Sequence, residues 1–177
     1  LTGVPTVATL PMWWQHGLPE EDGVFDDRSR SSGAVTKTIA VIAYPRLSNL
    51  DEFQPLKNIP GVRLLWARSP ADLAGLQATD WVILPGSKHT SSDLAWLRAQ
   101  GLDQAIAHHA GNRGMVLGVC GGLQMLGEAL IDPHGIDGNG PGLGLLSLVT
   151  VFEENKTVQH SRARFEALRG PWAALSG

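Results

Sequence analysis

The spacing of apolar residues divides the chain into an irregular first part and a regular second part. Residues 1–36 hold one short strand candidate, Val4–Leu10, and no sustained hydrophobic period. Arg28–Lys37, rich in Ser and Arg, is typical of a linker. From Thr38 onward short apolar runs alternate with segments of helical spacing. We therefore expect a domain boundary in the linker and one domain over residues 37–177.

The regular part predicts five strands. Leu145–Phe152 predicts a strand that is antiparallel or lies at a sheet edge. The unbroken apolar run at Met115–Val119 is typical of a strand buried on both faces. The four apolar runs that predict buried strands are Thr38–Tyr44, Val62–Trp66, Trp81–Leu84 and Met115–Val119.

Helices are predicted between these strands. Asn49 and Glu52 have the spacing of a capping box that opens a short helix. A brief helix is expected at Pro70–Ala74, and a longer one at Asp93–Ala110 with Gly101 interrupting it. Strands that alternate with helices predict an α/β fold with a mostly parallel, doubly wound sheet and helices on both faces. Ligands of such sheets bind at the carboxyl ends of the strands.

A cysteine stands between the last buried strand and a helix. Gly118-Val-Cys-Gly-Gly122 matches the pattern of a nucleophile elbow, in which the turn has no room for side chains two residues either side of the nucleophile. Cys120 would attack a substrate, and the N–H of Gly121 would stabilise an oxyanion. The alternative is an inert Cys in a glycine-rich turn.

The loop after the third strand offers further site residues. Gly86 lets the backbone turn toward Cys120, so the N–H of Gly86 or of Ser87 is a candidate second oxyanion donor. The same loop predicts Ser92 or Asp93 as the N-cap of the following helix. Gln124 lies one helical turn after Cys120 on the same face, where it would contact a substrate.

A thiolate nucleophile normally needs a histidine to take up and return protons. His108 and His109 end a helix, where a cation is favourable for structural reasons alone. His160 follows a strand and has the least unfavourable spacing, yet no histidine has an acidic residue two positions on. No Cys and His cluster has metal-ligand spacing, so we predict no metal site.

Composition narrows the class of protein. The 177 residues are 43% hydrophobic and 18% charged, as in an ordinary globular domain. A net charge of -3 without a basic cluster argues against a nucleic-acid partner. One cysteine excludes an internal disulfide and fits a reducing cytoplasm. No apolar run approaches the roughly 18 residues of a membrane span.

Four motifs in order resemble a known family, over about Thr38–Phe152. They are similar to the class I (triad) glutamine amidotransferases, in the branch of the cobyric acid and cobyrinic acid diamide synthases. The four are Leu84-Pro-Gly-Ser-Lys-His-Thr90, Asp93-Leu-Ala-Trp-Leu97, Gly118-Val-Cys-Gly-Gly-Leu-Gln-Met-Leu-Gly127 and Pro141-Gly-Leu-Gly-Leu145.

The resemblance implies a flavodoxin-like fold and a glutaminase reaction. Cys120 would attack the side-chain amide of glutamine, Gly86 and Gly121 would supply the oxyanion hole, and Ser87 and Gln124 would bind the substrate. Ammonia would pass to a synthetase domain that uses ATP and Mg²⁺ to amidate carboxylates of a corrin ring. No cofactor is expected in this chain itself.

The same resemblance implies that the chain is a fragment. Residues 1–36 look like the tail of the synthetase domain followed by a linker. The family's catalytic histidine lies in a Tyr-Leu-His-Gly-like motif, which the 177 residues do not contain. We therefore expect that histidine beyond Gly177, and little turnover by these residues alone.

Two other classes of protein share parts of this pattern. Proteases and stress-response proteins of the same superfamily would carry a His directly after the cysteine, where Gly121 stands. A non-catalytic binding module would need no thiolate, and its Cys120 would react with iodoacetamide like an ordinary thiol.

Overall fold

The structure, a computed structural model, describes residues 34–155 and 160. The strand expected at Val4–Leu10 and most of the expected linker lie outside the described residues.

The main sheet has four parallel strands in the order β2-β1-β3-β4. Ile39 at the centre of the sheet pairs with Leu64 on one side and Trp81 on the other. The four predicted strands are confirmed, each within two residues of its expected bounds. They are β1 (Lys37–Ile42), β2 (Val62–Ala67), β3 (Trp81–Leu84) and β4 (Met115–Gly118).

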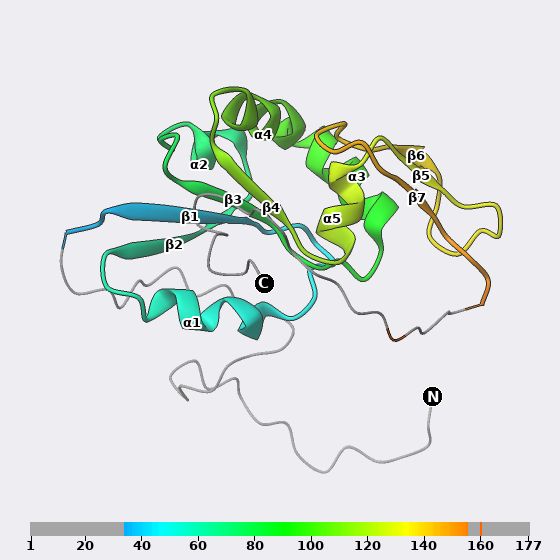
Figure 1. Cartoon of the computed structure of the whole chain (residues 1–177), viewed down its shortest axis with the longest axis horizontal. Coiled ribbons are helices and arrows are strands. Elements are labelled where there is room, and N and C mark those ends of the chain that lie inside the picture. The colour runs from blue at the N-terminus through cyan, green and yellow to red at the C-terminus, as the bar shows by residue number, and fades with distance from the viewer. Residues whose placement is uncertain (1–33, 156–159, 161–177) are drawn as a thin grey trace, which may run out of the picture.

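Helices lie on both faces of this sheet, as predicted. Figure 1 shows α1 below the sheet, α2 and α4 above it, and α3 and α5 toward the end where β3 and β4 finish. The helical elements are η1 (Leu50–Phe53), α1 (Gln54–Lys57), α2 (Pro70–Leu73), α3 (Thr90–Ala99), α4 (Leu102–Gly111) and α5 (Gly121–Leu126). The break expected at Gly101 is present, because Gly101 adopts a φ of 74° between α3 and α4.

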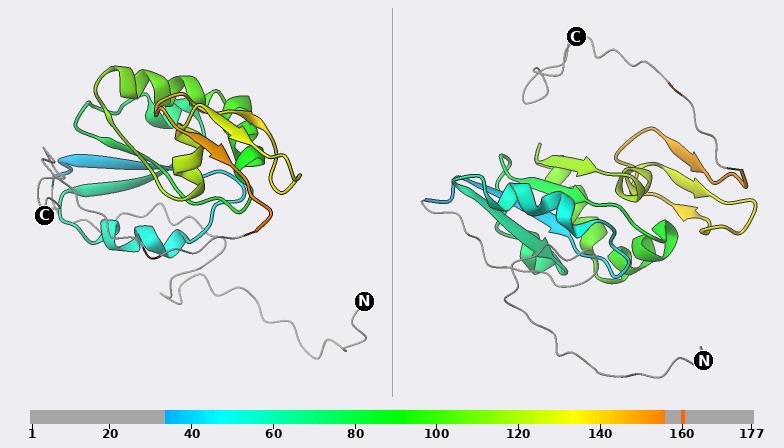
Figure 2. Two further views of the ribbon diagram at one scale, coloured as in Figure 1. Left: turned by 45° about the vertical axis from the view of Figure 1, so that its right-hand side comes forward. Right: turned by 90° about the horizontal axis from the view of Figure 1, so that it is seen from below.

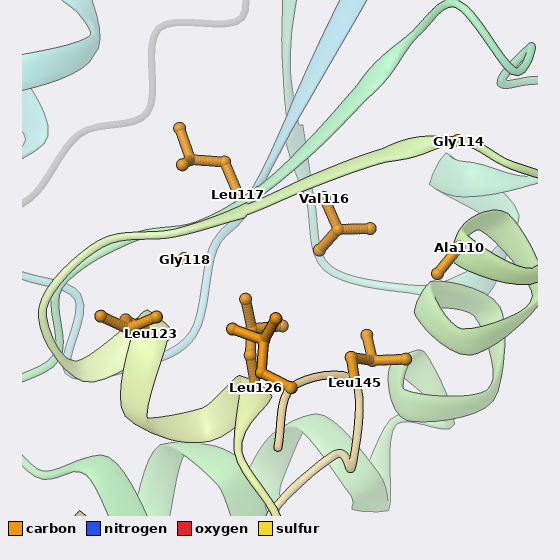
Figure 3. A pocket seen from close by; sticks show the side chains of 9 residues that line it. Ala110, Gly114, Val116, Leu117, Gly118, Leu123, Leu126 and Leu145 are labelled. Atoms are coloured by element: carbon orange, nitrogen blue, oxygen red, sulfur yellow. The ribbon is translucent and has the colours of Figure 1, made fainter. Parts of the chain in front are cut away.

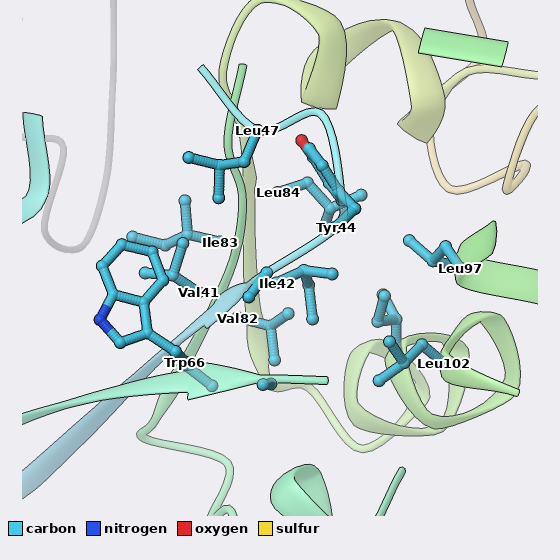
Figure 4. Close-up of a cluster of buried hydrophobic side chains, with 14 of the residues drawn as sticks. Val41, Ile42, Tyr44, Leu47, Trp66, Val82, Ile83, Leu84, Leu97 and Leu102 are labelled. Carbon is cyan, nitrogen blue, oxygen red and sulfur yellow. The ribbon is translucent and has the colours of Figure 1, made fainter. Parts of the chain in front are cut away.

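The core covers both faces of the main sheet, and one part of it lies between the strands and the helices above them. Figure 4 shows Ile42 and Val82 of the sheet facing Leu97 and Leu102. All four of these side chains are fully buried. The core therefore fixes α3 and α4 against β1 and β3, and with them the loop that leads into α3.

Among the described residues, β4 is an edge strand of the main sheet. Each of its four residues is half-exposed, whereas Thr38–Ile42 in β1 are buried. The expectation of a strand buried on both faces is wrong for the part of the chain that is described. The reason is that β4 pairs only with β3 there, so one side of the strand stays open.

A second, smaller sheet follows α5. Its order is β6-β5-β7, and Figure 2 shows it beside the main sheet. The strand expected at Leu145–Phe152 is present at an edge of this sheet, yet it runs parallel to its neighbour rather than antiparallel. The strands are β5 (Ala129–Ile131), β6 (Gly140–Pro141) and β7 (Val149–Val151).

The capping box expected at Asn49 does not form. Asn49 has φ 55° and ψ 58°, whereas a capping residue needs extended backbone. Its side-chain amide instead donates to the carboxylate of Glu52 at 3.0 Å. A capping box does form at α2, where Ser69 is extended and its N–H donates to Asp72 at 2.9 Å.

Candidate active site

Cys120 occupies a tight turn between β4 and α5. Its φ of 51° and ψ of -113° form a conformation that side-chain-bearing residues rarely adopt and that costs on the order of 1–3 kcal/mol. The N–H of Gly122 donates to the carbonyl of Val119 at 2.8 Å and closes the turn beneath it. Cys120 is exposed as a result.

Gly118 and Gly122, two residues either side of Cys120, stand where the structure leaves no room for a side chain. A Cβ at Gly118 would lie 2.6 Å from the Cα of Leu123. A Cβ at Gly122 would overlap the backbone carbonyl of Leu84. Both obstacles are backbone atoms, so neither can move aside as a side chain can. The spacing of glycines around the cysteine is therefore what allows β4, the turn and α5 to pack against β3.

Two backbone N–H groups lie together beside Cys120. A Cβ at Gly121 would be 3.0 Å from the backbone N of Ser87, and a Cβ at Gly86 would be 3.9 Å from the Cβ of Cys120. Within residues 34–155, no hydrogen bond uses the N–H of Ser87 or of Gly121 as its donor. In this loop Ser87 is the neighbour of Gly121, and Gly86 is the neighbour of Cys120.

The loop after β3 is held against the loop after β1. The N–H of Ser48 donates to the carbonyl of Gly86 at 2.9 Å, and the N–H of Lys88 donates to the carbonyl of Arg46 at 2.8 Å. A Cβ at Gly86 would collide with the hydroxyl of Ser48. A side chain at position 86 would therefore require the hydroxyl of Ser48 to turn away.

Asp93 is a buried carboxylate under this loop, 1% exposed. One oxygen accepts the hydroxyl of Ser87 at 2.6 Å, and the other accepts the N–H of Arg46 at 3.1 Å. Burial raises the pKa of Asp93, although the hydrogen bonds from Ser87 and Arg46 oppose the shift. Sequence reasoning considered Asp93 only as an N-cap and missed this role, although its position four residues before the buried Leu97 places it on the core-facing side of the helix.

The N-cap expected at Ser92 or Asp93 is wrong. The helix α3 begins earlier, at Thr90, and its N-cap residue His89 makes no capping bond with its own side chain. The carboxylate of Asp137 instead accepts the N–H of Thr90 at 2.8 Å. A contact across 47 positions leaves no local pattern in a sequence.

Gln124 lies over the turn, half-buried. Its backbone N–H donates to the carbonyl of Cys120 at 3.2 Å, which places it one turn along α5. The hydroxyl of Thr90 donates to its side-chain oxygen at 3.1 Å. The side-chain amide is thereby oriented with its oxygen toward α3, and its NH₂ group makes no hydrogen bond within the described residues.

The histidines of the described residues have other surroundings. His109 is buried at the end of α4, with Nε2 3.2 Å from the carbonyl oxygen of Asp80. Nδ1 of His89 lies 3.7 Å from Asp137. His160, the candidate base, is exposed. No hydrogen bond or ion pair of residues 34–155 and 160 joins a histidine to Cys120.

An apolar pocket of about 340 Å³ lies beside β4 rather than at Cys120. Figure 3 shows aliphatic side chains of Val116, Leu126 and Leu145 around it. Such a lining has no polar side chain to orient a polar substrate, so this pocket is not the candidate site. Among the described residues, no three His, Cys, Asp or Glu gather into a group that could hold a metal, and no helix is long and apolar enough to cross a membrane.

The fold is that of a class I glutamine amidotransferase, with the turn at Cys120 at the end of its parallel sheet. Residues 38–176 match the CobB/CobQ-like glutamine amidotransferase domain, and the chain belongs to this family.

Three relatives carry one name. The chain is 81% identical, over all of its length, to the cobyric acid synthase of Polaromonas naphthalenivorans (strain CJ2), of which it covers 36%. It is 77% identical, over 99% of its length, to that of Variovorax paradoxus (strain S110), again covering 36%. It is 68% identical, over all of its length, to that of Polaromonas sp. (strain JS666 / ATCC BAA-500), covering 38%. The chain thus spans little more than a third of these proteins.

Proposed function

We propose that this chain is the glutamine amidotransferase part of a cobyric acid synthase and that Cys120 is its nucleophile. The observation that carries the proposal is the exposed Cys120 in a strained turn beside two unused N–H donors. Backbone strain persists where surrounding structure enforces it, and it is concentrated at functional sites. The identity to proteins named cobyric acid synthase supports the substrate, glutamine.

The thiolate of Cys120 attacks the side-chain amide carbon of glutamine, and the carbonyl π electrons move to oxygen. The N–H groups of Gly121 and Ser87, on the loop that Gly86 allows near the cysteine, donate to this oxyanion. The nitrogen gains a proton, the C–N bond breaks, and ammonia leaves a thioester. Water then hydrolyses the thioester to glutamate and frees the thiol. The NH₂ group of Gln124 binds an oxygen of the glutamine.

The proton transfers need a general acid and base near pH 7. Because no described histidine is bonded to Cys120, we assign this role to a residue outside the described part of the chain, not to His160. A chain in which no base reaches Cys120 should form a covalent adduct but release ammonia at background, since loss of the base in such a pair removes several powers of ten in rate.

Our proposal for how the ammonia is used rests only on the name of the relatives, cobyric acid synthase. We propose that residues 37–177 form the glutaminase domain and that residues 1–36 are a linker and the end of a synthetase domain. That domain would bind ATP and Mg²⁺ and amidate corrin carboxylates. No residue of this chain is assigned to those steps.

Labelling of Cys120 by a diazo-ketone analogue of glutamine tests the proposal. Because the chain has one cysteine, intact mass reports the site directly. We expect saturable labelling that glutamine protects against, and none in Cys120→Ala. Iodoacetamide, which needs only a thiolate, is the control for general reactivity. Labelling by the analogue that is neither saturable nor slowed by glutamine would contradict a glutamine site.

A further inference from the structure

The two carboxylate oxygens of Asp93 hold two different loops. Oδ1 accepts the N–H of Arg46 from the loop after β1, and Oδ2 accepts the hydroxyl of Ser87 from the loop after β3. Asp93 itself is fixed in the first turn of α3 and is 1% exposed. A carboxylate has no role of its own in a hydrophobic core, and its desolvation opposes folding unless its oxygens are satisfied.

The hydroxyl of Ser87 connects this carboxylate to the loop. It donates to Asp93 and accepts the N–H of His89 at 3.0 Å. Two residues earlier, the carbonyl of Pro85 accepts the buried hydroxyl of Tyr44. Both hydrogen bonds of the Ser87 hydroxyl are thus made within the protein, while the nitrogen of its backbone N–H lies beside Gly121, 3.0 Å from where a Cβ of that residue would stand. The orientation of that N–H depends on where the Ser87 side chain is held.

We propose that Asp93 is a positioning residue, which holds the Ser87 N–H in place as an oxyanion donor. This inference rests on the proposed function of Cys120 as a glutaminase nucleophile. Asp93 touches no substrate and acts only through Ser87. A displacement of about 1 Å at a reacting centre costs on the order of 10²-fold in rate, so release of this loop should reduce the rate of adduct formation by about that factor.

The test separates a loss of positioning from a loss of thiol reactivity. In the 177-residue chain, Asp93→Asn keeps one side-chain oxygen, which can accept the N–H of Arg46. Its NH₂ group cannot accept the hydroxyl of Ser87, as the second carboxylate oxygen does. We expect the maximal rate of labelling by the diazo-ketone analogue to fall by about 10²-fold. The rate of alkylation by iodoacetamide should stay unchanged, since that reaction forms no oxyanion.

Two further variants separate the loss of this hydrogen bond from a general loss of stability. Ser87→Ala removes the same hydrogen bond from its other end, so it should show the same loss, and the double variant should lose no more than either single variant. Asp72→Asn, a half-buried Asp in the capping box of α2, is the control for a general loss of stability and should leave both rates unchanged.

The outcomes are distinct. Analogue labelling of Asp93→Asn or Ser87→Ala at the parental rate would overturn the inference, and so would an equal fall in both rates, which would place the effect at the Cys120 turn. Failure of the parent chain to react with the analogue would instead contradict the proposed function, and with it this inference.

Discussion

Ser91 binds Asp137 through both its backbone N–H and its hydroxyl, although the two residues lie 46 positions apart in the chain. The N–H donates to a carboxylate oxygen at 2.7 Å, and the hydroxyl donates to the backbone carbonyl at 2.6 Å. Asp137 also accepts the N–H of Thr90. The N-terminus of α3, where the loop after β3 ends, is therefore capped by the loop between β5 and β6.

Replacement of this cap should destabilise the domain. We expect Asp137→Ala to lower the free energy of unfolding by about 1 kcal/mol, with about 2 kcal/mol as the upper end for a lost N-cap. Asp137→Asn, which keeps an acceptor oxygen, should lose less. Urea unfolding followed by circular dichroism measures both. If the Ala variant unfolds at the parental urea concentration, the cap contributes nothing to stability.

A second prediction concerns the turn at Cys120. In Gly122→Ala the new methyl group would overlap the carbonyl of Leu84, so we expect a loss of about 1–3 kcal/mol of stability. Gly111→Ala is the matched control, because a Cβ there meets no atom within 4 Å and Ala favours the helix. Thermal unfolding of both variants provides the measurement. Equal melting temperatures for the two would show that the chain does not pack tightly behind the cysteine.

Local patterns predicted the main sheet, because each of its four strands is an apolar run, as expected of a parallel sheet covered by helices. The same reasoning overestimated the burial of β4, since the pattern records the apolar character of a strand and not its place in the sheet. It also missed β5 and β6, of three and two residues, which are too short to show a period.

At the candidate site, the sequence was informative where one residue type is needed for a local reason. The glycines around Cys120 are of this kind, and the structure supplies the backbone atoms that exclude a Cβ. Contacts between segments that are distant in the chain could not be predicted from the sequence. The hydrogen bond from Ser91 of α3 to Asp137 and the one from Arg46 to Asp93 each join residues more than 45 positions apart.

Tyr44 is the one tyrosine of the chain, so its titration can be followed without interference. Burial, and then the nearby charges of Asp93 and Cys120, raise its pKa far above the usual value. Because the folded pKa is the higher one, its contribution to stability is fully present below the unfolded pKa of about 10 and is lost as the pH rises toward the folded value.

A pH jump tests this expectation. After a jump to about pH 11, tyrosinate absorbance should rise only as fast as circular dichroism is lost, since a tyrosine of pKa about 10 ionises there once exposed. Tyr44→Phe, which leaves the carbonyl of Pro85 without its donor, should lose about 1–3 kcal/mol at pH 7. An immediate rise in absorbance with intact circular dichroism would mean that the hydroxyl is accessible and its pKa ordinary.

The last prediction is that Gln124 contributes to binding of glutamine rather than to chemistry. Its amide oxygen is occupied by Thr90, which leaves the NH₂ group as the donor to a substrate oxygen. Loss of one such hydrogen bond costs about 1 kcal/mol. Gln124→Ala should therefore raise the analogue concentration that gives half the maximal labelling rate about fivefold, and it should leave the maximal labelling rate unchanged. Thr90→Val keeps the side-chain amide of Gln124 but removes the hydrogen bond that orients it. This variant should therefore raise the half-saturating analogue concentration by a smaller factor. A fall in the maximal rate without a change in saturation would instead place Gln124 among the groups that act on the reacting amide.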